Sequence, residues 1–64
     1  YFKYVSTDVW EVGFRAAHNS PIDVGKIAAS FGGGGHKKAA GATVHLPLET
    51  IKEQVIELVK EQLL

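Results

Sequence analysis

The first part of the chain alternates between apolar and polar residues. Residues 1–5 are aromatic or β-branched apart from one lysine, residues 6–8 are turn formers, and the alternation resumes over residues 9–17. Two alternating runs joined by a short turn predict a β-hairpin, because successive side chains of a strand point to opposite faces. In the second strand we expect one face to carry Trp10, Val12, Phe14 and Ala16. The other face would carry Val9, Glu11, Gly13 and Arg15, with the glycine leaving the backbone accessible beside the arginine.

Two helices are predicted by apolar residues that recur every three or four positions. The first would begin after Asp23 as N-cap and end at Gly32 as C-cap. Its apolar face consists of Val24, Ile27, Ala28 and Phe31. The second would have Pro47 in its first turn, with Thr50 and Glu53 spaced as a capping box. Its apolar stripe consists of Ile51, Val55, Leu58, Val59 and Gln62 or Leu63.

The segment between the two helices opens with four consecutive glycines, residues 32–35. Residues 36–40 are long enough for about one helical turn, which Gly41 would end, and residues 42–46 alternate as a strand. We therefore predict a mixed α/β fold in the order β-β-α-(glycine loop and short turn)-β-α. Both helices would pack on the small sheet, and residues 1–64 would form one domain.

Composition limits the size of the core and the kinds of site. With 64 residues and 45% hydrophobic content, the chain can form one small core of marginal stability. There is no Cys, which excludes disulfides and thiolate metal sites and fits a cytoplasmic protein. No apolar run is long enough to span a membrane. The chain has no Met and begins within an apolar run, so we expect it to be a fragment of a longer protein.

Positive charge is concentrated around the glycines. The seven basic and seven acidic residues cancel, so binding of nucleic acid would depend on local clustering. Residues 32–46 provide that clustering, because they include Lys37, Lys38 and two histidines but no carboxylate.

The glycine run itself predicts an anion-binding loop. Ordering four glycines costs much conformational entropy, so a folded domain keeps them where another group must approach the backbone. Unpaired backbone N–H groups in such a loop can converge on a phosphate, and His36, Lys37 and Lys38 add donors beside it. Adjacent lysines on a helical turn cannot both face the ligand, and the pattern leaves open which of them does. The spacing does not fit the nucleotide-binding P-loop.

The segment Gly32–Gly41, preceded by Ile22–Val24 and Ile27–Phe31, resembles the DHH-associated C-terminal domain of the DHH phosphoesterase superfamily. The resemblance covers Val9 to about Leu63. The superfamily includes oligoribonucleases, phosphatases that act on phosphoadenosine phosphate, and RecJ-type single-strand exonucleases. It implies a separate N-terminal domain that carries an Asp-His-His motif and a pair of manganese (or magnesium) ions, while the C-terminal domain grips the substrate.

The resemblance also implies which residues bind. Family members often have Ser-x-Arg-Ser on the strand before the loop, and Gly13-Phe14-Arg15-Ala16 keeps the arginine but lacks both serines. A guanidinium at this place can hold a phosphate bidentately. From the motif and its neighbours, the predicted substrate-binding residues are Arg15, Gly33, Gly34, Gly35, His36, Lys37, Lys38 and Ala39.

No catalytic or metal-binding residue is predicted in this chain. Two-metal phosphoryl transfer needs several close carboxylates or histidines, and the spacing of His18, His36 and His45 matches no compact metal-ligand motif. The leading hypothesis is a substrate-recognition domain that serves a manganese-dependent DHH phosphoesterase. Its partners would be short single-stranded RNA or DNA, or a phosphorylated nucleotide, together with the N-terminal DHH domain of the same polypeptide.

Two alternatives remain open at this point. Domains of the KH type also clamp a nucleic-acid backbone with a helix, a glycine-containing loop and a basic turn, but they continue into a full helix where residues 42–46 predict a strand. A purely structural or dimerising domain would bind no anion at all. The sequence does not choose between RNA, DNA and a mononucleotide, and it specifies neither strand polarity nor oligomeric state.

Overall fold

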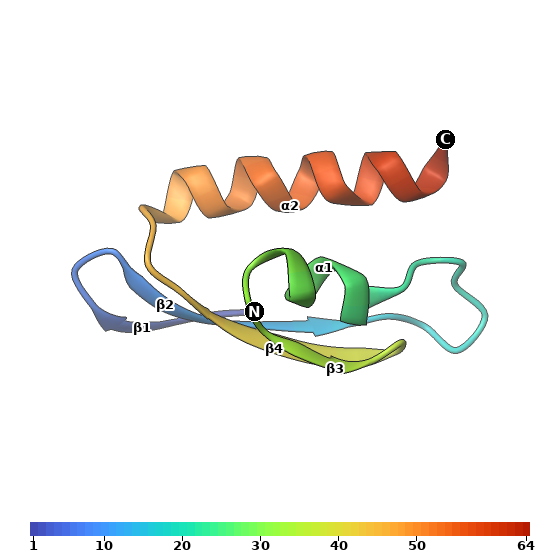
Figure 1. The fold of residues 1–64 in the computed structure, drawn as a ribbon, viewed down its shortest axis with the longest axis horizontal. Coiled ribbons are helices and arrows are strands. Elements are labelled where there is room, and N and C mark those ends of the chain that lie inside the picture. Colours follow the sequence, from blue (N-terminus) through green and yellow to red (C-terminus); the bar gives the residue numbers. More distant parts are fainter.

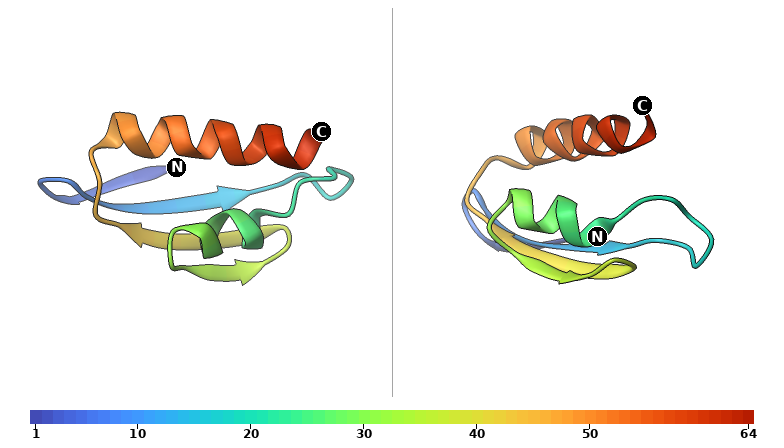
Figure 2. Two further views of the ribbon diagram at one scale, coloured as in Figure 1. Left: turned by 45° about the horizontal axis from the view of Figure 1, so that its top comes forward. Right: turned by 45° about the vertical axis from the view of Figure 1, so that its right-hand side comes forward.

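A computed structural model describes all 64 residues as a four-stranded sheet with both helices on one side of it (Figure 1). The elements in chain order are β1 (Phe2–Ser6), β2 (Val9–Arg15), α1 (Val24–Ser30), β3 (Gly34–His36), β4 (Ala39–Val44) and α2 (Leu48–Leu63). The strands are arranged β1-β2-β4-β3, and all neighbours are antiparallel. The predicted mixed α/β fold, with helices packed on a small sheet, is confirmed (Figure 2).

The prediction of a helical turn at residues 36–40 is wrong. β3 and β4 form a hairpin in which His36 pairs with Ala39 and Gly34 pairs with Gly41, so the two lysines between them make the turn. β4 also pairs with β2 along its whole length and begins three residues earlier than predicted, at Ala39. Hydrogen bonds to two neighbouring strands outweigh the small helix propensity of alanine, which is a weak preference that tertiary structure readily overrides.

The predicted β1–β2 hairpin is present. Phe2 pairs with Val12 and Tyr4 pairs with Trp10, and the strands are joined through Asp8, which adopts a left-handed φ of 55°. Aspartate tolerates this conformation better than most residues. The predicted faces of β2 are also correct, because Val12 belongs to the buried core and Trp10 packs against it.

The core is small and lies between the sheet and the helices. Only seven of the 64 residues are buried, and the central cluster consists of Val12, Val44 and Ile51. Phe14 and Phe31 extend this cluster by stacking with ring centroids 6.5 Å apart. Ile51 is fully buried, and Val55, Leu58 and Val59 of the predicted apolar stripe are half-buried, so α2 packs most closely near its first turn.

The ends of α1 follow the predicted caps. The carboxylate of Asp23 accepts a hydrogen bond from the backbone N–H of Lys26 at 3.2 Å, as an N-cap does. At the other end, Phe31 is the C-cap and Gly32 follows it with a φ of +81°. The predicted glycine stop is therefore displaced by one residue, and its left-handed conformation explains why a glycine is needed there.

The predicted capping box of α2 is wrong. The helix begins directly after Pro47 and has no side-chain capping hydrogen bond, so Thr50 lies within its first turn. Pro47 is extended, with a φ of −57° that the proline ring favours, and it sets the start of the helix before Thr50 can act as a cap.

The last turn of α2 is attached to the start of α1 by one side chain. The Gln62 Oε1 accepts the backbone N–H of Asp23 at 2.7 Å, and its Nε2 donates to the carbonyl of the same residue at 2.9 Å. These two hydrogen bonds join residues 39 positions apart and hold the C-terminal half of α2, which contributes no buried residue.

We predict that Gln62→Ala lowers the free energy of unfolding by about 1–3 kcal/mol, because it leaves the half-buried backbone N–H of Asp23 without a protein partner and removes a second hydrogen bond to the carbonyl of that residue. Urea denaturation followed by circular dichroism measures this change. Lys60→Ala in the same helix is the control, because the Lys60 side chain is 68% exposed and makes only a loose surface ion pair, and it should stay within about 0.5 kcal/mol of the parent chain. Equal losses in the two variants would contradict the role of Gln62.

Candidate functional site

The strand register places four of the predicted binding residues, Arg15, Gly34, His36 and Ala39, on the outer face of the sheet, which we define as the face opposite the helices. Gly33 and Gly35 lie toward the helices, and Lys37 and Lys38 form the turn. Directly paired residues of antiparallel strands point to the same face, and Val12 and Phe14 point toward the helices. The alternate residues therefore line the outer face in three rows across the strands. The rows are Arg15–Ala39–His36, Gly13–Gly41–Gly34 and Glu11–Thr43.

Arg15 and His36 belong to the same row, on either side of Ala39. Adjacent strands are separated by about 4.8 Å, so the backbones of these two residues lie about 10 Å apart. The methyl group of Ala39 leaves the space between the two longer side chains open. Both Arg15 and His36 are exposed, so one small anion can contact the guanidinium and the imidazole together.

The two lysines of the β3–β4 turn differ in their surroundings. Lys38 is half-buried, and its ammonium group donates a hydrogen bond to the carbonyl of Ser20. The turn backbone is held as well, because Ala16 donates to the carbonyl of Lys38 at 3.1 Å and Val24 donates to that of Lys37 at 3.0 Å. Lys37 is exposed and has no hydrogen bond or ion pair from its side chain. Of the two predicted lysines, Lys37 is the one available to a ligand.

The cations near the glycine loop have no carboxylate partners. Three of the seven basic residues of the chain form ion pairs, which are Lys3–Glu11 at 3.9 Å, Lys52–Glu49 at 4.0 Å and Lys60–Glu57 at 3.9 Å. Arg15, Lys37 and Lys38 form none. Positive charge that is not neutralised within the chain attracts an anionic ligand.

Three of the four consecutive glycines are required by the fold itself. Gly32 and Gly33 donate their N–H groups to the α1 carbonyls of Ala29 and Ala28, at 3.0 and 2.9 Å. A side chain at Gly33 would overlap Ala42, and one at Gly35, whose φ is +145°, would overlap Ala40. The predicted nest of successive free N–H groups is therefore wrong for Gly32 and Gly33, because their amides cap the preceding helix.

Gly34 differs from its neighbours. A Cβ atom added there would meet nothing within 4 Å, and its φ lies outside the left-handed region that favours glycine. On the adjacent strand, a Cβ at Gly41 would meet only the Val12 carbonyl, at 3.3 Å. We call these two outer-face residues the glycine floor. Nothing inside the chain requires Gly34, so its bare backbone fits close approach by another molecule.

Gly13 does not provide the accessible backbone that the alternating pattern predicts. It is buried, and a side chain at this position would overlap the ring of Tyr1. The two residues also exchange backbone hydrogen bonds, with Gly13 donating to Tyr1 at 2.9 Å and Tyr1 donating to Gly13 at 2.7 Å. The alternation within β2 could not reveal this, because the ring belongs to Tyr1, the residue just before β1.

A shallow hollow of about 450 Å³ borders the glycine floor. It is lined by Tyr1, Glu11, Val12, Gly32, Gly33, Gly41, Ala42 and Thr43. Sequence reasoning identified neither Glu11 nor Thr43 as a candidate. No local signal marks them, since they become neighbours only through the pairing of β2 with β4.

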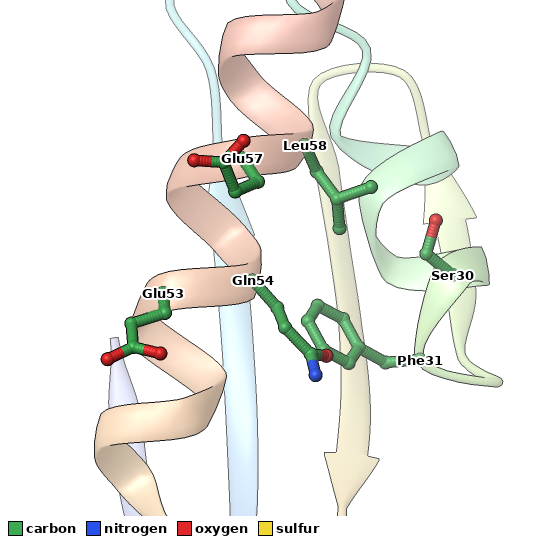
Figure 3. Close-up of a pocket in the computed structure, with 6 residues that line it drawn as sticks. All are labelled: Ser30, Phe31, Glu53, Gln54, Glu57 and Leu58. Atoms are coloured by element: carbon green, nitrogen blue, oxygen red, sulfur yellow. The ribbon is translucent and has the colours of Figure 1, made fainter.

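A second hollow of about 410 Å³ lies between α2 and the end of α1 (Figure 3). Phe31, Gln54 and Leu58 point into it, and Glu53 and Glu57 lie along it on α2. It holds none of the predicted binding residues and belongs to the helical side of the molecule. Its carboxylates would repel a phosphate, so we do not assign the anion site there.

The structure contains neither a cluster of metal-binding side chains nor a membrane-spanning helix. No three His, Cys, Asp or Glu side chains come close enough together to hold a metal ion. Neither helix is long and apolar enough to cross a membrane. What the outer face offers is a set of hydrogen-bond donors and positive charges beside an exposed backbone.

Comparison with known proteins identifies the family. A family model described as the DHHA1 domain matches residues 2–63. No curated protein and no solved structure shows a significant match. The matched segment includes every strand and helix, together with Arg15, His36 and the glycine floor. The chain therefore belongs to the DHHA1 family, the DHH-associated domains of DHH phosphoesterases.

Proposed function

We propose that this domain recognises the substrate of a DHH phosphoesterase by holding a phosphate group on its outer face. The substrate would be a short single strand of RNA or DNA, or a phosphorylated nucleotide. The observation that carries the proposal is that Arg15, His36 and Lys37 have no carboxylate partners and lie on the same sheet as Gly34, where a side chain would meet no atom of the chain. Membership of the DHHA1 family supports it.

Each residue would have a distinct part in phosphate binding. The planar guanidinium of Arg15 would donate two parallel hydrogen bonds to phosphate oxygens, and His36 would donate one from the other side of Ala39. Gly34 would let the phosphate approach the strand backbone, and Lys37 would add long-range attraction. Gly13 and Ala16 stand where family members often have serines, so in this chain the arginine and histidine would supply most of the side-chain donors.

The hydrolytic step would take place in a separate domain. Residues of this chain do not fit the pair of metal ions, since no cluster of potential ligands exists. We place a manganese or magnesium pair in an N-terminal DHH domain of the same polypeptide, where it would polarise the scissile phosphate. The task of the present chain would be to bind the substrate and position it against that domain.

The KH-like alternative is not favoured, because the structure has the β3–β4 hairpin where that hypothesis needs a full helix. A purely structural role would leave the unpaired cations and the bare Gly34 without an explanation. A purely structural domain would bind no phosphorylated oligonucleotide, whereas the proposed domain would bind one.

We expect Arg15→Ala and His36→Ala each to weaken binding of a short 5′-phosphorylated single strand by about 1–3 kcal/mol, through loss of charge-assisted hydrogen bonds. Fluorescence anisotropy titration of the labelled oligonucleotide measures the change. Lys26→Ala is the matched control, since Lys26 is also exposed and unpaired but belongs to α1 on the helical side. Binding as tight as that of the parent chain in both site variants would refute the assignment.

Gly34→Ala should separate binding from folding. The added methyl group meets no atom of the chain, so we expect unchanged or slightly higher stability, by up to about 1 kcal/mol. The same methyl group should obstruct the ligand and weaken its binding. Gly35→Ala is the contrasting variant and should lower stability, because its φ of +145° and its contact with Ala40 both oppose a side chain. Urea denaturation and the same titration give both quantities, and undiminished binding by a folded Gly34→Ala variant would count against the site.

A further inference from the structure

The hollow beside the glycine floor has no part in phosphate binding as described above. It continues the outer face along the strands, away from Arg15 and His36 and toward Glu11 and Thr43. It is directly connected to the phosphate site, because Gly41 in its lining pairs with Gly34. A ligand whose phosphate lies between Arg15 and His36 would therefore place its remaining atoms over this hollow.

The spacing of the rows suits a nucleotide. Each residue of a strand advances by about 3.3 Å, so the glycine row lies about 7 Å from Arg15 and the Glu11 row about 13 Å from it. A sugar and base attached to a phosphate at the first row would extend over the second row. The edge of the base would then face the side chains of the third row, Glu11 and Thr43.

The shape of the hollow suits a flat ring. Its base is formed by strand backbone and Gly41, with no large side chain standing above it. One wall is the aromatic ring of Tyr1, which lies over Gly13. Aromatic side chains beside exposed backbone are the usual means of holding an unpaired base, because every base has a face that can stack.

Glu11 gives this hollow a chemical preference. It is the only carboxylate on the outer-face positions of the four strands. Its one partner is Lys3, at 3.9 Å, and both side chains are more than half exposed, so the pair is loose and open to exchange. An ionised carboxylate only accepts hydrogen bonds, so it selects a base edge that presents donors without a neighbouring acceptor.

Guanine is the base that meets this requirement. Its N1–H and N2–H groups are adjacent donors and match the two oxygens of one carboxylate. Adenine and cytosine place a ring-nitrogen acceptor beside their amino group, and uracil flanks its N3–H with two carbonyls, so each would bring an acceptor against Glu11. The hydroxyl of Thr43, opposite Glu11 on β4, can donate to the guanine O6.

We propose that the hollow is a nucleobase subsite that selects guanine through the carboxylate of Glu11. This inference rests on the proposed phosphate-binding function, because the phosphate fixes the position of the base. It adds a specificity-determining residue that lies outside the glycine motif, and it names guanine nucleotides as the preferred substrate class.

The test is an NMR titration of the isotope-labelled chain with the 5′-monophosphates of guanosine, adenosine, cytidine and uridine, and with inorganic phosphate. We expect the guanosine nucleotide to bind about tenfold more tightly than the other three. Its resonance shifts should include Glu11, Gly41 and Thr43. In Glu11→Gln the guanine preference should be lost, because an amide offers one donor and one acceptor and each of the four bases presents an edge that matches such a pair.

Two control variants separate base recognition from other effects. Lys3→Gln breaks the Lys3–Glu11 ion pair but keeps the carboxylate, so the guanine preference should survive. Glu61→Gln removes a negative charge from exposed α2 and should leave all affinities unchanged. Loss of the preference in Lys3→Gln as well as in Glu11→Gln would assign the effect to the ion pair and overturn the proposal.

The base subsite and the phosphate site can be tested separately with the same nucleotides. Equal affinities for the four nucleotides, or a guanine preference that persists in Glu11→Gln, would overturn the base subsite while Arg15-dependent phosphate binding remained. Absence of binding by every nucleotide and by inorganic phosphate would overturn the phosphate site and, with it, the base subsite.

Discussion

The structure depends on the pairing of β4 with a strand on each side. Six residues of β4 pair with β2, and three of the same residues pair with β3. In the first half of β4, the backbone N–H and C=O groups form hydrogen bonds to β2 on one side and to β3 on the other. This central position brings β2 and β3, which are distant in the sequence, to either side of the same strand. Arg15 at the end of β2 and His36 at the end of β3 become neighbours only because both are paired with Ala39.

The same pairing explains the small residues around the site. Ala40 and Ala42 point toward the helices, where Gly35 and Gly33 approach them so closely that any side chain on either glycine would overlap. On the other face, Gly34 and Gly41 form the bare glycine floor, which nothing in the chain covers. One short segment therefore serves two purposes, because alternation along the strands assigns its residues in turn to packing and to the exposed surface.

Charge is divided between the two sides of the domain, although its net value is zero. Four of the seven acidic residues are spaced every four positions along exposed α2, namely Glu49, Glu53, Glu57 and Glu61. Arg15, His36 and Lys37 belong to the sheet and to the turn between its strands, without carboxylate partners. This separation of charge favours the approach of an anion to the outer face. It disfavours an anion on the helical side, where the second hollow lies (Figure 3). Glu11 is the exception on the outer face, where it pairs with Lys3 at 3.9 Å.

The sequence by itself determined the hairpin of β1 and β2, the two helices, the apolar side of β2 and the family. These features depend on alternation, helical spacing and a motif, which involve residues close together in the chain. Tertiary structure decided the conformation of residues 36–40, because β4 pairs with β2 and β3 and these residues form a hairpin in place of the helical turn that local composition favours. It also decided which glycines serve the fold, which lysine is free, and that Glu11 and Thr43 are neighbours. Each of these depends on contacts between segments far apart in sequence, whose register no local pattern specifies.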